Sequence, residues 1–118
     1  MSQSPEPMVK AFADCEPYTQ DEPPGASFKW LLKKDQVPGL CMGLVTLEGP
    51  IHKTPAAHEE WEQVYVIHSG TGTLHMAGKD YRIAGPSIVV IPKNTMHSME
   101  LKAGEKMQYA FVNQYLTS

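Results

Sequence analysis

Short segments with apolar or alternating side chains recur along most of the chain, and their spacing predicts strands rather than helices. Turn-forming residues, such as those at Pro38-Gly39 and Gly85-Pro86, separate nearly all of these segments. The ten prolines and nine glycines interrupt the chain often, so we expect no helix of useful length. The predicted strands are residues 28–32, 40–47, 63–68, 72–76, 81–84, 87–91, 96–101 and 107–115. Eight or nine short strands predict an all-β fold, a small barrel or sandwich.

The beginning of the chain has a different pattern. Residues 1–27 are polar and rich in proline, with one short apolar stretch at 8–12. We expect them to form an extended N-terminal arm, with an edge strand as one form it can take. A chain of 118 residues suits one hydrophobic core, so residues 28–118 are predicted to form a single barrel domain.

The segment from residue 63 to residue 67 carries apolar groups at both parities. Because side chains of a strand alternate between its two faces, Gln63, Tyr65 and Ile67 share one face, and Val64 and Val66 share the other. This pattern is typical of a strand buried on both sides, in a barrel that encloses a cavity.

Composition and charge narrow the class of protein. With 42% hydrophobic residues and no apolar run approaching about 18 residues, the sequence predicts a soluble protein without a membrane span. Residues 1–10 lack the apolar core of a signal peptide, so we expect a cytoplasmic location. The net charge is -3 and the basic residues are scattered, so nucleic acid is not an expected partner. Cys15 and Cys41 stand apart and predict free thiols.

Three side chains that can bind metal, His58, Gln63 and His97, occur at informative spacing. Residues 49–70 resemble the first motif of the cupin superfamily, G-x5-H-x-H-x(3,4)-E-x6-G. Residues 86–97 resemble the second motif, G-x5-P-x-G-x2-H. The sequence is identified on these motifs as a small single-domain cupin, with the resemblance covering residues 28–115. The resemblance implies a double-stranded β-helix, or jelly-roll barrel, with a metal site inside it.

Laid on the family pattern, the second histidine falls on His58, the carboxylate on Gln63 and the last histidine on His97. The first histidine falls on Ala56, so one ligand is missing. Asn94 stands at a turn position usually given to glycine, and asparagine tolerates the left-handed conformation such a turn requires.

Three other side chains are candidates for the missing ligand, and the sequence leaves the choice among them open. His52 has the strand parity of Ala56, but four extended residues span about 13 Å, too far unless the chain folds back. Glu59 and Glu62 are nearer, yet on an ideal strand each points away from the faces of His58 and Gln63. The remaining histidines, His68 and His75, are not expected to be ligands.

The resemblance implies a divalent transition metal: iron, manganese, nickel, copper or zinc. Three neutral ligands leave the ion its full charge, which favours an anionic partner such as a small carboxylate or a sugar-derived molecule. Tyr65, on the face of Gln63, is the candidate catalytic residue, as proton donor or anion binder.

A rival hypothesis follows from Ala56: a non-catalytic cupin with a degraded metal site, serving as a ligand-binding, structural or interaction module. Whether the protein is an enzyme stays open. A small barrel that is not fully closed leaves strand edges that need cover, so we expect a homodimer.

Overall fold

The computed structural model describes residues 5–20 and 22–115, and in these residues it is almost entirely β-structure. A short 3-10 helix, η1 (Phe12–Asp14), precedes the strands. The strands are β1 (Pro17–Tyr18), β2 (Ala26–Leu32), β3 (Leu40–Glu48), β4 (Ile51–His52), β5 (Glu62–Met76), β6 (Lys79–Ala84), β7 (Ser87–Ile91), β8 (His97–Leu101) and β9 (Lys106–Gln114). The all-β prediction is confirmed. No helix in the described ranges is long and apolar enough to cross a membrane.

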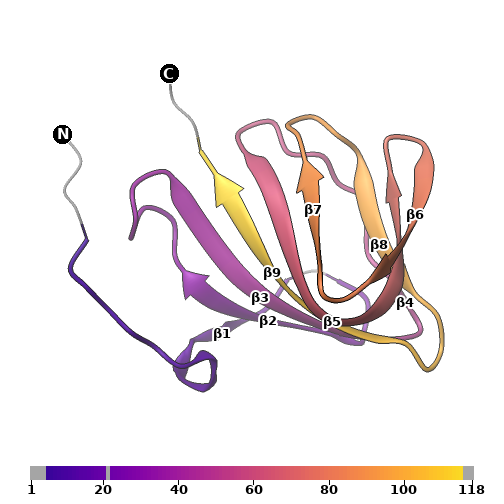
Figure 1. The fold of residues 1–118 in the computed structure, drawn as a ribbon, viewed down its shortest axis with the longest axis horizontal. Coiled ribbons are helices and arrows are strands. Elements are labelled where there is room, and N and C mark those ends of the chain that lie inside the picture. Colours follow the sequence, from indigo (N-terminus) through magenta and orange to yellow (C-terminus); the bar gives the residue numbers. More distant parts are fainter. Residues whose placement is uncertain (1–4, 21, 116–118) are drawn as a thin grey trace.

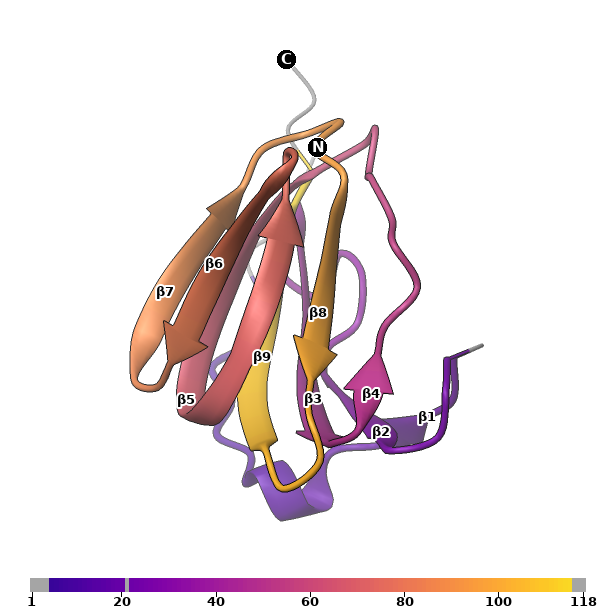
Figure 2. The same ribbon diagram turned by 90° about the vertical axis from the view of Figure 1, so that its right-hand side faces the viewer.

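All the strand pairs are antiparallel, and the sheet curls on itself (Figure 1). The hydrogen-bonded order is β1-β2-β3-β9-β5-β8-β4, with β6 and β7 also paired to β5. The first half of β5 pairs with β7 and β9, and its second half pairs with β6 and β8. Figure 2 shows β8 lying between β5 and the short edge strand β4. The long strand β5 therefore belongs to both walls of the barrel.

The separate strands predicted at 63–68 and 72–76 are one continuous strand, β5, so the break predicted between them is wrong. The strand continues through a register shift between Ile67 and Ser69. Gly70 has a φ of 97° and lies so close to the backbone of Lys106 and Met107 that a Cβ would not fit. A bulge bends a strand without ending its pairing, so the chain turns from one wall to the other without reversing.

The N-terminal arm contacts the barrel through its own short edge strand. β1 pairs with β2, and the Tyr18 ring stacks on Trp30 with centroids 4.1 Å apart. Cys15 is buried and Cys41 is buried in the core, and both are free thiols. The apolar faces of β2, β3, β5, β8 and β9 enclose the core between the walls.

Glycine at position 43 makes room for one wall of the interior. A Cβ at this position would collide with the ring of Phe111, which lies opposite Gly43 on β9. Only a residue without a side chain allows the Phe111 ring to lie flat across β3. The sequence at this position thus shapes the inner surface of the barrel.

A register shift also separates β4 from the segment that follows it. His52 pairs with Glu100, while Ala56 forms a bridge with His97. Ala56 is four positions after His52, whereas Glu100 is only three positions after His97. One extra residue moves all subsequent side chains to the opposite face. The face that His52 occupies is therefore not the face of Ala56, although the two have the same parity in sequence.

Candidate ligand and metal sites

A cavity of about 200 Å³ lies inside the barrel, and all the site residues predicted from the sequence line it. The side chains come from both walls: β5 supplies one face, β8 and the segment after β4 supply the other. The lining residues that bear on its chemistry are Lys53, His58, Trp61, Gln63, Tyr65 and His97.

Backbone hydrogen bonds hold the two histidine-bearing segments together. Ala56 and His97 exchange both N–H···O bonds, at 3.0 and 2.9 Å. The Asn94 N–H donates to the His58 carbonyl at 2.8 Å. Asn94 has a φ of 61°, so the expected left-handed turn is present. The Asn94 turn therefore contacts the segment that carries His58, and three residues later His97 lies at the cavity.

The two imidazoles face one another in a form suited to binding metal. Their ring centroids are 5.2 Å apart, within the roughly 6 Å that two imidazoles on one ion can span. The Nδ1 atom of His97 lies 2.9 Å from the Thr95 carbonyl, so Nδ1 donates and Nε2 keeps its lone pair. Burial lowers the pKa of both rings, and the proximity of His97 lowers that of His58 further. Both rings are therefore neutral near pH 7.

Gln63 brings an unsatisfied acceptor into the same cavity. The residue is 6% exposed, and its Nε2 donates to Asn113 Oδ1 at 2.8 Å. Its Oε1 is buried and has no hydrogen-bond partner in the described structure. Leaving a buried acceptor unpaired costs roughly 1–3 kcal/mol, so this oxygen suits a ligand or an ion. His58, Gln63 and His97 are thus a donor set that fits a divalent transition metal.

Tyr65 lies beside this set but is deeply buried. Its ring centroid is 6.2 Å from that of His97 and 4.5 Å from that of Tyr109. Burial raises its pKa well above the ordinary value, and the neighbouring Tyr109 raises it further. The hydroxyl therefore stays protonated and can donate a hydrogen bond.

Sequence reasoning missed the cation of the cavity. Lys53 is half-buried, and its Nζ donates to the Tyr109 hydroxyl at 3.3 Å. The same Nζ lies 5.5 Å from the centre of the Phe28 ring. Lys53 follows His52 directly, and no motif marks it. In a strand, neighbouring side chains point to opposite faces, so an outward His52 is the one signal that could have indicated an inward Lys53.

None of the three alternatives for the missing ligand lines the cavity. His52 is exposed on the outer face of the sheet, and Glu59 is exposed. Glu62 accepts a hydrogen bond from the Lys93 backbone N–H at 2.7 Å, away from the imidazoles. Ala56, by contrast, does line the cavity, opposite His97. Position 56 is therefore the place where a fourth ligand would stand.

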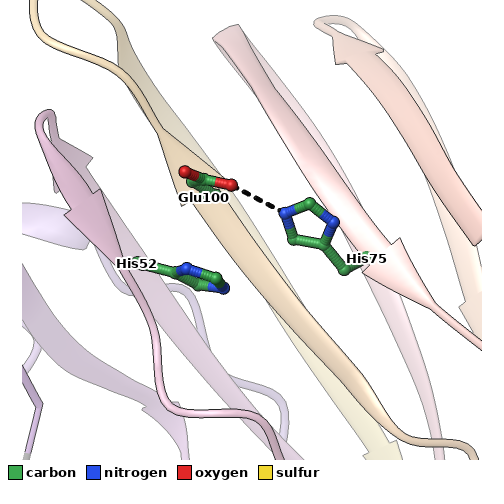
Figure 3. A group of neighbouring side chains, drawn as sticks. All are labelled: His52, His75 and Glu100. Carbon is green, nitrogen blue, oxygen red and sulfur yellow. Dashed lines mark hydrogen bonds and ion pairs between the residues drawn. The ribbon is translucent and has the colours of Figure 1, made fainter. Parts of the chain in front are cut away.

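A second group of donor side chains lies on the outer face of the β4–β8–β5 wall. His52, Glu100 and His75 come from these three strands, and their nearest ligand atoms all lie within 4.8 Å of one another (Figure 3). His75 Nε2 is 2.7 Å from a Glu100 carboxylate oxygen. The sequence analysis did not expect His75 to be a ligand and did not single out Glu100. Only the cross-strand register brings these residues together.

The cupin fold and the cavity together define the class of this protein, and comparisons with known proteins agree. The sequence matches the model of the AraC-like ligand binding domain over residues 39–114. The chain belongs to this cupin-type family. No curated protein matches its sequence.

Solved structures show the same fold. A predicted oxalate decarboxylase from Thermotoga maritima has a TM-score of 0.82 at 21% identity, over 92% of this chain and 100% of that one. The polyketide cyclase RemF from Streptomyces resistomycificus has a TM-score of 0.75 at 17% identity, over 91% of this chain and 80% of that one. A cupin 2 conserved barrel protein from Rhodopseudomonas palustris has a TM-score of 0.70 at 20% identity, over 87% and 72%.

Proposed function

We propose that the barrel binds a small anionic molecule, a carboxylate or a sugar-derived acid, beside a divalent transition metal held by His58, Gln63 and His97. The observation that carries the proposal is the unpaired Gln63 oxygen, which shares one cavity with two neutral imidazoles. When bound, the ion would act as a Lewis acid that attracts an anionic oxygen.

The charges that face the cavity support an anionic ligand. Lys53 contributes a positive charge, and neutral His58 and His97 add none. Glu22 also lines the cavity, where its carboxylate accepts a hydrogen bond from the Thr54 N–H at 3.3 Å, and its negative charge offsets that of Lys53. With a divalent ion present, the site has a net positive charge, and a carboxylate would balance it.

The size of the cavity restricts the ligand. Its volume of about 200 Å³ lies below the roughly 300–1,000 Å³ of typical small-molecule pockets. A molecule of a few carbon atoms with one or two carboxylates fits this space. One of the similar structures is a predicted oxalate decarboxylase, and oxalate is a small carboxylate of the proposed class.

Tyr65 has the position and protonation of a hydrogen-bond donor to such a ligand. Because burial raises its pKa well above the ordinary value, the hydroxyl keeps its proton and can donate a hydrogen bond to an anionic oxygen. Lys53, through the Tyr109 hydroxyl, adds a second polar contact on the same side. We propose Tyr65 as the candidate catalytic residue if the ligand is transformed.

Calorimetry with untagged protein tests the proposal. Zn²⁺ or Ni²⁺ is titrated first, and then oxalate, malonate and a uronic acid are titrated into the metal-loaded protein. Lys53→Met is expected to weaken binding of the preferred carboxylate about tenfold, and Lys106→Met, an exposed lysine on β9, is expected to leave it unchanged. Absence of carboxylate binding by the metal-loaded protein would contradict the proposal.

A second candidate function is a non-catalytic module that binds an effector without metal. Ala56 favours it, because the site lacks one ligand of the family pattern, and so does a family described by ligand binding. The metal-free protein distinguishes the two: under this alternative it binds the same carboxylate as tightly as the metal-loaded protein.

We also infer a homodimer, on the strength of an exposed apolar stripe. Val66, Ile88 and Val90 are 40%, 68% and 60% exposed, so the prediction that the 63–67 segment is buried on both sides is wrong for the face that carries Val66. Val66 pairs with Ile88 across β5 and β7, so these side chains form one surface. Burying it against a second copy would remove apolar area from water. Light scattering that gives a mass near 13 kDa at micromolar concentration would refute the dimer.

A further inference from the structure

We infer that the outer face of the β4–β8–β5 wall carries a second metal site, in which His52, His75 and Glu100 bind a divalent transition ion of the zinc class. This site lies outside the barrel and shares no ligand with the inner cavity. It does not depend on the proposed function of that cavity.

The pairing of the strands places the side chains of His52, His75 and Glu100 on the same face of the sheet. His52 pairs directly with Glu100 across β4 and β8, and His75 pairs with Ser98 across β5 and β8. Directly paired residues of antiparallel strands share a face, and so do residues two apart in one strand. The intervening residues Leu74 and Met99 are buried in the core. The three adjacent strands therefore bring the side chains of His52, His75 and Glu100 close together, as Figure 3 shows.

The distances suit an ion after small side-chain rotations. The nearest ligand atoms lie within 4.8 Å of one another, and the His52 and His75 ring centroids are 5.3 Å apart. Zinc bonds of about 2.0–2.1 Å place tetrahedral ligand atoms roughly 3.3 Å apart. The widest pair must therefore close by at most about 1.5 Å, and the His75–Glu100 pair, at 2.7 Å, must open slightly. Partly exposed side chains can make such rotations without disturbing the core.

A further carboxylate orients one of the ligands. Asp80, on β6, lies 2.6 Å from His75 Nδ1, on the opposite side of the ring from Glu100. A histidine that donates one ring N–H to a carboxylate presents its other nitrogen as a stronger ligand. Ser98 Oγ, 3.2 Å from His52 Nε2, contacts the second imidazole. The cluster thus has supporting contacts for both histidines as well as its three ligands.

In the metal-free protein a proton takes the place of the ion. His75 lies between two carboxylates, which raise its pKa, so a proton on Nε2 holds it to Glu100. An ion pair alone would need only His75 with Glu100 or Asp80. His52 stands beside that pair as a further donor, and two imidazoles with one carboxylate are a recognised donor set for transition metals. Metal binding would exchange the proton for the ion, with Nε2 and the carboxylate oxygen then both binding the metal.

The chemistry of the donors defines the class of ion. Two imidazoles with one carboxylate select zinc, cobalt, nickel, copper or ferrous iron over magnesium and calcium, which prefer oxygen. Three protein ligands leave the fourth position to water. An ion here would also tie the two-residue edge strand β4 to β5 across β8.

The test counts Zn²⁺ ions bound to untagged protein in which His58→Ala has weakened the inner site. Circular dichroism verifies the fold, and equilibrium dialysis with metal analysis gives the stoichiometry. The parent variant is expected to bind one Zn²⁺, and the addition of His75→Ala should abolish that binding. The matched control adds His68→Ala, which removes an exposed histidine of the same strand and should leave one ion bound.

Two further measurements identify the ligands. Asp80→Asn is expected to weaken Zn²⁺ binding by about 10-fold to 100-fold through loss of the orienting carboxylate. Co²⁺ bound to the His58→Ala protein should give a visible absorption band. Adding His52→Ala or Glu100→Gln should remove this band, and excess Mg²⁺ should not displace the Co²⁺. If the His58→Ala protein binds no Zn²⁺, or if His75→Ala leaves binding unchanged, the outer site does not exist.

Discussion

The inner cavity and the outer cluster use the same strand, β8, and both contain two histidines, yet the pKa of His75 in the outer cluster is shifted in the opposite direction from those of His58 and His97 in the cavity. Inside, burial lowers the pKa of His58 and His97, and both rings are neutral. Outside, Asp80 and Glu100 raise the pKa of His75 and favour its charged form. Because the residue type is the same, the surroundings determine the protonation state of each imidazole.

This difference has a consequence for metal binding. The inner imidazoles have their lone pairs ready, but the site has no carboxylate among its proposed ligands. The outer cluster has a carboxylate but must release a proton before His75 can bind. A comparison of the two sites in one protein therefore separates the effect of burial from the effect of charge.

The largest expected effect comes from removing His97. His97→Ala takes away one inner imidazole whose tautomer the Thr95 carbonyl sets, and should weaken inner-site Zn²⁺ binding at least about 100-fold. Binding at the outer cluster should not change, because Ser98 and Glu100 keep their backbone. Equilibrium dialysis measures both in one experiment. Equal loss at the two sites would show that the variant disturbs β8 as a whole.

Gly43→Ala should alter the inner region alone. The added methyl collides with Phe111, so we expect a loss of about 1–3 kcal/mol in the free energy of unfolding, together with a smaller cavity. Urea denaturation measures the stability. Thr46→Ser, at an exposed position on the same strand, keeps the hydroxyl that accepts a hydrogen bond from Gln108 and should change the stability by less than about 0.5 kcal/mol. A Gly43→Ala protein as stable as the wild type would contradict the packing argument.

Ala56→His tests whether the inner site is incomplete. The new side chain would lie opposite His97 on the cavity side, and a fourth ligand should raise Ni²⁺ or Zn²⁺ affinity about tenfold, near 1.4 kcal/mol. Calorimetry on the apo proteins measures the change. If neither protein binds metal at this site, the non-catalytic hypothesis gains support. If the ring overpacks the core instead, stability falls by roughly 1–3 kcal/mol.

The smallest expected effect concerns acid stability of the outer surface. The carboxylate of Glu105 accepts hydrogen bonds from Arg82, the Lys102 backbone N–H and Thr71, which lower its pKa to about 2. A depressed carboxyl pKa contributes stability above the unfolded value, and this stability is lost as pH falls from about 4.5 toward 2.

Denaturation at pH 7 and pH 3 tests this sign. Glu105→Gln should be less stable than the wild type at pH 7, and the difference should shrink at pH 3. The control, Glu48→Gln, changes an exposed carboxylate on β3 and should show little difference at either pH. A Glu105→Gln effect that is constant with pH would contradict the ionic explanation.

Local patterns in the sequence were enough to predict the fold class and the grouping of the inner residues. Gln63 and Tyr65 share a face because period two holds within a single strand, and the resemblance to the two motifs implies that His58 and His97 belong to the same inner site. The structure brings these side chains to one cavity. Metal ligation by them stays a prediction.

The sequence by itself determined which residues alternate within each strand, because the pleat of a strand is a local property of the backbone. Only the tertiary structure decided how the strands align. The single extra residue between His52 and Ala56 turned His52 outward and Lys53 inward, against the parity read from the sequence. The pairing of β4, β8 and β5 then brought together His52, His75 and Glu100, which lie far apart in the chain. Bulges and cross-strand register depend on contacts between distant segments, and no pattern within one strand encodes them.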